Sequence, residues 1–386
     1  MEVKDVAKKY KQYVIDLRRE FHMYPEASFQ EHRTSKRVRE ELGKMGIPCY
    51  LVGETGVVGI IEGAKPGKTV ALRGDMDALD LHEENEVEYK SKNENYMHGC
   101  GHDGHTAMLL GAAKVLQEMK DQLKGKVKLF FQPAEELALG AKSMLSEIDD
   151  VDNILGMHVW SPIPSGKISV DPGPKMAATD IFKIRVKGKG GHGSAPHQGV
   201  DAVVIASAIV MNLQTLVSRE ISPLESVVVS VGLLKAGSRF NVLAGDGILE
   251  GNVRSFNPEL RKELPKMIER VAKNTAASYR GEIEMEYFWG TPPTINDEKS
   301  AARAAKAVEK ILGSQGVIKH EKVTGGEDFA YFLEKVPGVL ALIGTGNPAK
   351  QTDYPHHHPK FNLDEDVLEY GMALCAQYAL DYLSEE

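Results

Sequence analysis

Cysteine is scarce in this sequence of 386 residues, which contains only Cys49, Cys100 and Cys375. Three widely spaced cysteines do not form a disulfide framework, and a reducing compartment fits them better. Long hydrophobic runs are also lacking, because stretches such as 203–211 are far shorter than the roughly 20 residues of a membrane span. The first residues show neither the apolar stretch nor the small-residue cleavage site of a secretory signal. We therefore expect a cytoplasmic protein with no membrane partner.

Long basic runs and zinc-finger spacings are absent as well, and the formal net charge is −8. These features argue against nucleic acid as a partner and favour a small molecule. Internal repeats and low-complexity tracts are lacking too. The chain is long and 42% hydrophobic, so it can bury a large core, and its length favours two domains.

Short apolar, β-branched runs alternate with helical patterns over much of the chain, which predicts an α/β fold with a mostly parallel sheet flanked by helices. The middle of the chain differs, because its patterns follow the order β-α-β-β-α-β of a ferredoxin-like α+β domain. We therefore predict a first domain formed by residues 1–177 and 291–386, interrupted by a smaller domain at 178–290.

The stretch "HGCGHDGH" concentrates one cysteine and three histidines in a loop rich in glycine. Cys100 and His102 lie two residues apart there, and the glycines allow both side chains to turn toward one point. Thiolate and imidazole are good ligands for zinc and similar metals. A structural loop with exposed histidines would have the same sequence, so the stretch alone leaves both interpretations open.

Other polar residues are predicted at the ends of buried strands. Glu135 and Glu136 follow the run "KVKLFF", His158 ends "NILGMH", and Asp75 follows "TVALR". In open α/β sheets, ligands gather beyond the carboxyl ends of strands. Each residue alone could be an ordinary polar or surface side chain, but their joint placement predicts a metal site. One carboxylate of the glutamate pair would then bind metal while the other handles protons.

A set of motifs along nearly the whole chain resembles the metal-dependent aminoacylase and carboxypeptidase family of amidohydrolases. More narrowly, it is similar to the branch with hippurate hydrolases, N-acetyl-diaminopimelate deacetylases and hydrolases of auxin–amino acid conjugates. The motifs that carry the resemblance are "LRREFHMYPEASFQE", "LRGDMDAL", "MHGCGHDGHTAMLLGAA", "FFQPAEE", "GMHVW", "GKGGHGSAPHQGVDA", "TGGEDFAYF" and "HHHPKF".

The resemblance implies a catalytic domain that holds two divalent metal ions, with an inserted lid domain. The lid strand "SVVVSVGLL" offers an edge for pairing, so we also expect a homodimer through the lid. Zinc or manganese is the expected metal, with cobalt or nickel as further options. Glu135 is the implied general base, and His192 of "GKGGHGS" is the implied lid histidine that reaches the substrate carbonyl in its own or a partner subunit's site. The implied metal ligands are Cys100, His102, Glu136, His158 and His357.

One position departs from the wider family. Where that family carries a histidine ligand, this sequence has Asp75, as in the branch whose cysteine binds metal. We therefore expect Asp75 and Asp77 to orient the ligands by hydrogen bonds. Arg239 and Asn241 lie in the predicted lid and could bind the carboxylate of the amino-acid product, although an exposed arginine is usually only solvated.

The implied reaction is the hydrolysis of the amide bond in small N-acyl amino acids, by a metal-activated water and a glutamate base. Two alternatives stay open from the sequence. One is a cysteine hydrolase with Cys100 as nucleophile, which leaves the Glu135–Glu136 pair unexplained. The other is a catalytically idle, metal-dependent binder of acylated amino acids, which would have no need of a general base.

Overall fold

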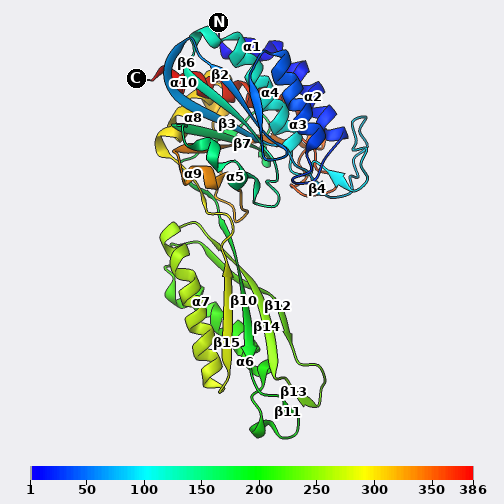
Figure 1. Ribbon diagram of the computed structural model, residues 1–386, viewed down its shortest axis with the longest axis vertical. Helices are drawn as coiled ribbons and strands as arrows, with labels where there is room; N and C mark the ends of the chain where they lie inside the picture. The colour runs from blue at the N-terminus through cyan, green and yellow to red at the C-terminus, as the bar shows by residue number, and fades with distance from the viewer. Residues whose placement is uncertain (1, 386) are drawn as a thin grey trace. The chain divides into compact units, whose positions relative to one another are not determined.

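The structure is a computed structural model that describes residues 2–385 (Figure 1). The chain forms two compact units. Unit 1 contains the residues up to Gly173, Ile295–Glu321, and the residues from Asp328 onward. Unit 2 contains Pro174–Thr294 and also Lys322–Glu327, a segment that the sequence placed with the first domain.

The centre of unit 1 is a seven-stranded mixed sheet in the order β1-β2-β6-β3-β7-β17-β8. Its four inner strands β6, β3, β7 and β17 are parallel, whereas β1, β2 and β8 add antiparallel pairs at the edges. The prediction of an α/β fold with a mostly parallel sheet is confirmed. The strands are β1 (Cys49–Val52), β2 (Gly56–Glu62), β3 (Lys65–Asp75), β6 (Lys124–Gln132), β7 (Asn153–Pro164), β8 (Ile168–Ser169) and β17 (Gly338–Gly346).

Helices cover both faces of this sheet. On one face, α4 and α10 pack over the central strands, and on the other the short α9 region places Phe329 and Phe332 beside Gly156 and Phe130. The helices are α1 (Val3–Lys9), α2 (Lys11–Met23), α3 (His32–Lys44), α4 (His102–Glu118), α5 (Gly140–Ser143), α8 (Glu298–Leu312), α9 (Ala330–Leu333) and α10 (Leu368–Ser384).

Strand register explains why polar residues collect at one edge of the sheet. Asp75 at the end of β3 pairs with Gln132 at the end of β6, so the chain leaves both strands at the same level. The prediction that His158 ends its strand is wrong, because β7 continues to Pro164 along β17. His158 nevertheless lies past Gly156, where the pairing of β7 with β3 stops, so its side chain still reaches this edge.

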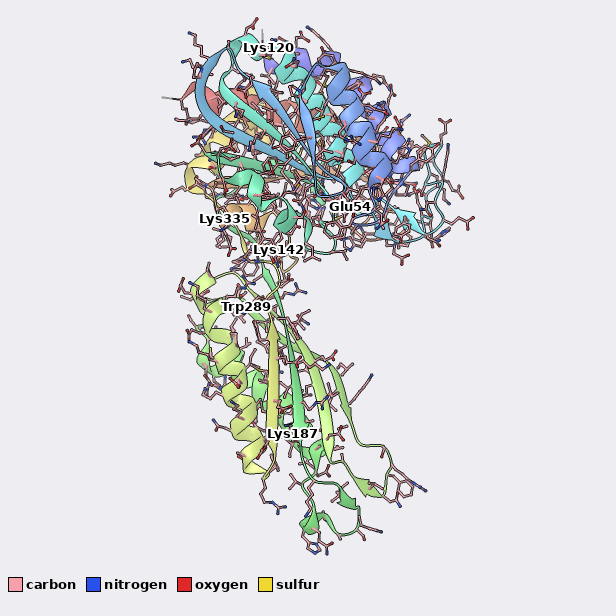
Figure 2. All side chains as sticks on the ribbon, viewed as in Figure 1. Glu54, Lys120, Lys142, Lys187, Trp289 and Lys335 are labelled. Atoms are coloured by element: carbon pink, nitrogen blue, oxygen red, sulfur yellow. The ribbon has the colours of Figure 1, made fainter. Side chains whose placement is uncertain are left out.

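Unit 2 has a four-stranded antiparallel sheet in the order β12-β14-β10-β15, with two helices on it. The alternation of buried and exposed residues along β10 is that of a half-buried strand, and Lys187 projects from its exposed end (Figure 2). The predicted β-α-β-β-α-β order is confirmed. The elements are β10 (Ala178–Lys187), α6 (Ala202–Thr215), β12 (Val227–Ala236), β14 (Asp246–Ser255), α7 (Pro258–Ser278) and β15 (Glu282–Phe288).

Both helices of unit 2 begin where the sequence provides a cap. The Asp201 side chain accepts from the Val203 N–H at the start of α6, and Asn257 caps α7 ahead of Pro258. The helical stretch Ala202–Glu220 is apolar and long enough to cross a membrane by length and composition alone. Its buried residues Ile205, Ile209 and Leu213 belong to the core of unit 2.

Candidate metal centre

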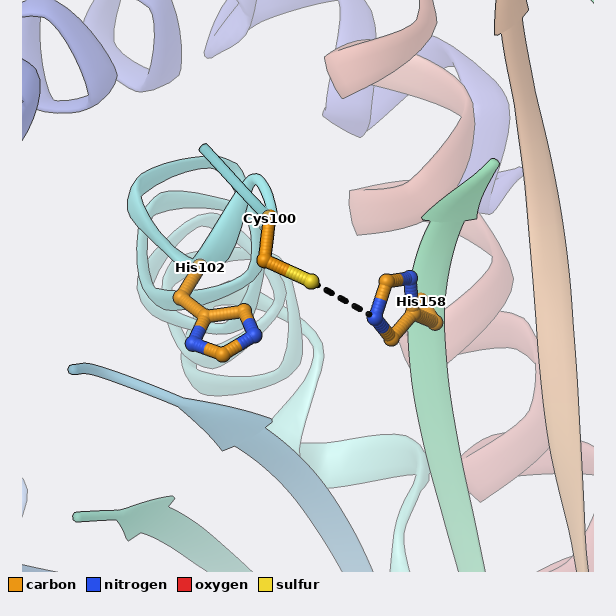
Figure 3. A group of neighbouring side chains, drawn as sticks. All are labelled: Cys100, His102 and His158. Atoms are coloured by element: carbon orange, nitrogen blue, oxygen red, sulfur yellow. Dashed lines mark hydrogen bonds between the residues drawn. The ribbon is translucent and has the colours of Figure 1, made fainter. Parts of the chain in front are cut away.

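The loop before α4 brings Cys100 and His102 to the carboxyl edge of the sheet. Gly101 adopts a left-handed conformation with φ of 89°, and a Cβ there would lie 2.3 Å from Val159 Cγ2, so this position requires glycine. The Cys100 Sγ lies 3.5 Å from Nε2 of His158, and His102 lies beside them (Figure 3). All three side chains are buried.

The Glu135–Glu136 turn is fixed by one carboxylate. The Asp77 side chain accepts the backbone N–H of Glu135 at 3.1 Å and that of Glu136 at 3.0 Å, after Ala134 has turned the chain with φ of 51°. Both glutamate side chains then approach the same atom, His102 Nε2, at 4.0 Å and 3.9 Å. The other oxygen of Glu135, Oε1, accepts from the Asp328 backbone N–H at 3.4 Å.

Of the three histidines in "HHH", His357 reaches this group. Its Nε2 lies 3.6 Å from Glu136 Oε1, and its backbone N–H donates to the Gly99 carbonyl. Its neighbours face elsewhere: His356 is directed at the Val159 carbonyl, and His358 stacks on Tyr354. Of the three, His357 alone therefore lies beside the candidate donors.

Hydrogen bonds set which nitrogen of each buried histidine is available. The His102 Nδ1 donates to the Asp77 carbonyl at 2.9 Å and lies 3.2 Å from its carboxylate, and His158 Nδ1 donates to the Val159 carbonyl at 2.6 Å. An oxygen acceptor at Nδ1 requires the proton on that nitrogen. In the neutral ring, Nε2 of each histidine then carries the lone pair and faces the cluster, as in metal-binding histidines.

A divalent cation fits these residues. Among the described residues, His102 Nε2 and Glu136 Oε1 are buried without a hydrogen-bond partner, which is costly unless an ion satisfies them. Burial raises the pKa of Cys100 well above its usual value and that of Glu136 to about 7. A bound cation would offset this cost. Sulfur, nitrogen and oxygen donors lie close together in several groups, three of which contain the predicted ligands: Cys100 with His102 and His158, Cys100 with Glu136 and His357, and His102 with Glu135 and Glu136.

Asp75 lies next to His102 and His105. It accepts from Arg73 Nη1 at 2.6 Å and from His105 Nδ1 at 2.5 Å, and its Oδ2 is 3.8 Å from His102 Nε2. Burial opposes ionisation of Asp75, but Arg73 and the two histidines hold its pKa well below the usual value. Asp75 is therefore an ionised carboxylate in the protein interior.

Two residues of this arrangement, Arg73 and His105, were not predicted from the sequence. Arg73 is fully buried and also donates to Asp328 Oδ1 and Gln132 Oε1, at 3.0 and 2.8 Å. His105 is fully buried one turn after His102 on α4. The spacing of His102 and His105 on one helix was the available signal for His105. Nothing in the sequence distinguishes Arg73 from other strand residues.

The predicted residues of the inserted domain lie together in unit 2. The short strands β11 (Gly191–His192) and β13 (Val242–Leu243) pair His192 with Val242, and the Gly193 N–H donates to the Asn241 carbonyl at 2.9 Å. His192, Arg239 and Asn241 are all exposed. Residues about 50 positions apart in sequence are thus neighbours at one end of this unit.

A two-unit α/β fold with a buried cluster of sulfur, imidazole and carboxylate donors beside a second glutamate defines the class of metal-dependent hydrolases. Residues 71–381 match the model of peptidase family M20/M25/M40, and the chain belongs to this family. The resemblance seen in the sequence is confirmed.

Individual relatives agree with this assignment. The chain is 43% identical to an N-acyl-L-amino acid amidohydrolase of Geobacillus stearothermophilus, over 93% of this chain and 98% of the relative. It is 40% identical to thermostable carboxypeptidase 1 of Saccharolobus solfataricus, over 98% of both chains. A solved structure of the Bacillus subtilis YXEP protein, described as a dinuclear metal-binding peptidase of family M20, is 36% identical with a TM-score of 0.87. The match covers 97% of this chain and 99% of that one.

Proposed function

We propose that this protein is a metal-dependent amidohydrolase that cleaves the amide bond of small N-acyl amino acids. The observation that carries the proposal is the cluster in which Glu135 lies beside buried, half-buried and, at His357, exposed donors, two of whose buried atoms lack a hydrogen-bond partner. The family supports the reaction class, and the Geobacillus relative supports the substrate class by its name. A panel of N-acyl amino acids would show which acyl group and which amino acid are preferred.

We propose Cys100, His102, Glu136, His158 and His357 as the ligands of two divalent ions. Asp77 and Asp75 would orient them, Asp77 through His102 and the glutamate turn and Asp75 through His105. A thiolate, imidazole and carboxylate set suits zinc, while manganese, cobalt or nickel could also be accommodated. When bound, such ions lower the pKa of a water and polarise a substrate carbonyl.

Glu135 is the proposed general base. It would take a proton from the attacking water as the new C–O bond forms, and give it to the amine nitrogen as the C–N bond breaks. Its carboxylate is only partly buried, and its backbone is held by Asp77, so the side chain has a fixed origin and access to substrate. The amide is thereby converted to a carboxylic acid and a free amino acid.

His192 is the proposed donor to the oxyanion of the tetrahedral intermediate, in its own or a partner subunit's site. Its Nδ1 accepts from the Ser194 N–H at 3.1 Å, with the Ser194 hydroxyl 2.8 Å away. In the neutral ring the proton then lies on Nε2, which makes the exposed end of His192 a hydrogen-bond donor. Such a donor is worth about 10²–10³ in rate. Arg239 and Asn241, at the same end of unit 2, are proposed to bind the carboxylate of the amino acid.

Burial of Cys100 opposes the alternative of a cysteine hydrolase. A cysteine nucleophile is normally accessible and has a lowered pKa, whereas Cys100 is 8% exposed and burial raises its pKa well above the usual value. A thiol of this kind becomes a thiolate when a cation binds it, which is the role proposed for Cys100 as a ligand.

The lid role and the homodimer are proposals of the same kind. Strand β12 forms one edge of the unit 2 sheet, and the neighbouring α6 exposes Val203, Val204 and Met211. Pairing of two β12 edges, with α6 against α6, would cover both the open edge and these apolar side chains. We propose this homodimer, in the cytoplasm and without a membrane partner.

The test measures amino-acid release from a panel of N-acetyl, N-benzoyl and N-indoleacetyl amino acids, with added zinc or manganese and with chelator. We expect release that depends on metal and a clear ranking of acyl groups. Binding of these compounds without product, by protein whose metal content is complete, would instead indicate the idle binder.

A further inference from the structure

The peptide group of Val159 adjoins the candidate ligand His158. The pairing of β3 with β7 ends at Arg73 and Gly156, three residues before Val159. The Val159 N–H and carbonyl both form hydrogen bonds with histidine side chains at this point of the strand. Backbone groups buried in this way need partners, and here the partners are titratable rings instead of a neighbouring strand.

His105 holds the N–H of this peptide. Its Nε2 accepts the Val159 N–H at 2.7 Å, so the ring proton is on Nδ1, which donates to Asp75 Oδ1 at 2.5 Å. Asp75 is in turn held by Arg73. A continuous chain of hydrogen bonds thus runs from a buried guanidinium to the backbone beside His158, and every member of the chain is fully buried or in the strand.

His356 holds the backbone carbonyl of the same residue, Val159. Its Nε2 lies 2.9 Å from the Val159 oxygen, which also accepts from His158 Nδ1 at 2.6 Å. The His158 ring packs between the two others, with centroid distances of 4.7 Å to His105 and 5.4 Å to His356. The backbone is therefore constrained on both sides of the Val159 Cα, and the His158 ring contacts both histidines.

We propose that His105 and His356, which lie outside the ligand set, are positioning residues for His158. By fixing the backbone N–H and carbonyl of Val159, they hold His158 with its proton on Nδ1 and with Nε2 directed toward Cys100. The His158 ring is then oriented before the metal binds. The inference rests on the proposed function, because it takes His158 as a ligand. Partners of this kind are typically worth about 10–100-fold in metal affinity.

Two amide substitutions separate the contacts of His105. In His105→Asn the amide can still donate to Asp75 but cannot reach the Val159 N–H. In His105→Gln the amide oxygen can take the place of Nε2, while the donation to Asp75 is lost. We expect His105→Asn to bind zinc about 10–100-fold more weakly than wild type in a competition with a chromophoric chelator. His105→Gln, which keeps the contact with Val159 and loses only the one with Asp75, should bind zinc more tightly than His105→Asn.

The pair His356→Gln and His356→Ala tests the contact with the Val159 carbonyl. This test does not depend on the folding of the His105 variants. Glutamine can keep a donor to the Val159 carbonyl, so only the alanine variant should lose metal affinity, by at least about tenfold. His358→Ala is the matched control, because His358 belongs to the same run but stacks on Tyr354. Its zinc affinity should equal that of wild type.

The unfolding midpoint in urea without metal is measured for each variant. A purely structural role predicts equal destabilisation of both His105 variants and unchanged metal affinity, and that result would overturn the inference. So would wild-type affinity in both His105→Asn and His356→Ala. Wild-type protein that binds no metal would overturn the proposed function and the inference together, whereas failure of the inference alone leaves wild-type metal binding and hydrolysis intact.

Discussion

Unit 1 encloses many charged side chains, whereas unit 2 encloses few, among them the buried Asp180–Arg261 pair. Arg18, Arg73, Asp75 and Asp103 are fully buried in unit 1, where Arg18 pairs with Asp103 and Arg73 pairs with Asp75 beside the candidate ligand His102. The core cluster of unit 2 consists of side chains such as Phe182, and charged pairs such as Lys183–Glu250 lie at its surface. Because a buried charge is costly unless it is paired or binds a metal, the buried charges beside His102 mark the site, whereas the core cluster of unit 2 relies on hydrophobic packing.

The proposed metal ligands and general base all lie in unit 1, and replacing one of these side chains should leave the fold intact. The largest effect is expected for Glu135→Gln, which removes the proposed base but keeps the size of the side chain. Hydrolysis should fall by about 10²–10⁴ while zinc binding and the unfolding midpoint stay near wild type. Steady-state rates with metal-loaded protein measure this, and full activity of the variant would exclude Glu135 as the base.

The reverse pattern is expected in the core of unit 2. Phe182 is fully buried, and a Cβ added at Gly251 would lie 2.2 Å from its ring, so the packing there is tight. Phe182→Ala should cost about 3–5 kcal/mol, seen as faster hydrogen exchange in peptides of unit 2 with unchanged zinc affinity. Ile181→Ala on the exposed face, where the residue is 52% exposed, is the control and should cost far less. Similar losses in both variants would contradict the assigned core.

Removal of metal should affect the two units unequally. A ligand at 100 times its dissociation constant stabilises the folded state by about 2.7 kcal/mol, and chelation removes that contribution. We expect peptides around Cys100 and Glu135 to exchange faster after chelation, while those of β10 and β14 do not change. Equal acceleration in both units would mean that the metal does not act where the donors cluster.

A smaller effect is expected at a charge of unit 1 away from the metal centre. Burial alone would raise the pKa of Glu41, but hydrogen bonds from Lys44, Tyr13 and Arg37 lower it to about 2. Because this pKa is lower than in the unfolded chain, Glu41 stabilises the fold above about pH 4.5, and the contribution is lost as the pH falls toward 2. Glu41→Gln should cost about 1–3 kcal/mol in urea unfolding at pH 7 and progressively less in acid. A cost that does not depend on pH would argue against the lowered pKa.

The same contrast explains what the sequence could predict. The alternating and helical patterns of unit 2 depend on local periodicity, and its β-α-β-β-α-β order was predicted correctly. The strand-end positions of Asp75 and the glutamate pair were also predictable, because the ends of parallel strands share an edge. Both predictions use patterns within single segments.

Other features depend on where segments meet. The role of His105 follows from the point at which β3 leaves β7, and that of Arg73 from carboxylates distant in sequence. The continuation of β7 past His158 depends on its pairing with β17, which begins only at Gly338. Periodicity within one segment contains no information on such contacts.

Glu135 is the proposed general base beside metal held by Cys100, His102, Glu136, His158 and His357. The most direct test measures bound metal and amino-acid release in the same samples, for wild type and Glu135→Gln, as metal-free protein is titrated with zinc or manganese. We predict that release by wild type rises with occupancy and vanishes with chelator, while Glu135→Gln fills to the same stoichiometry and releases almost nothing. Release that is independent of metal content, or equal in the two proteins at full occupancy, would contradict the account.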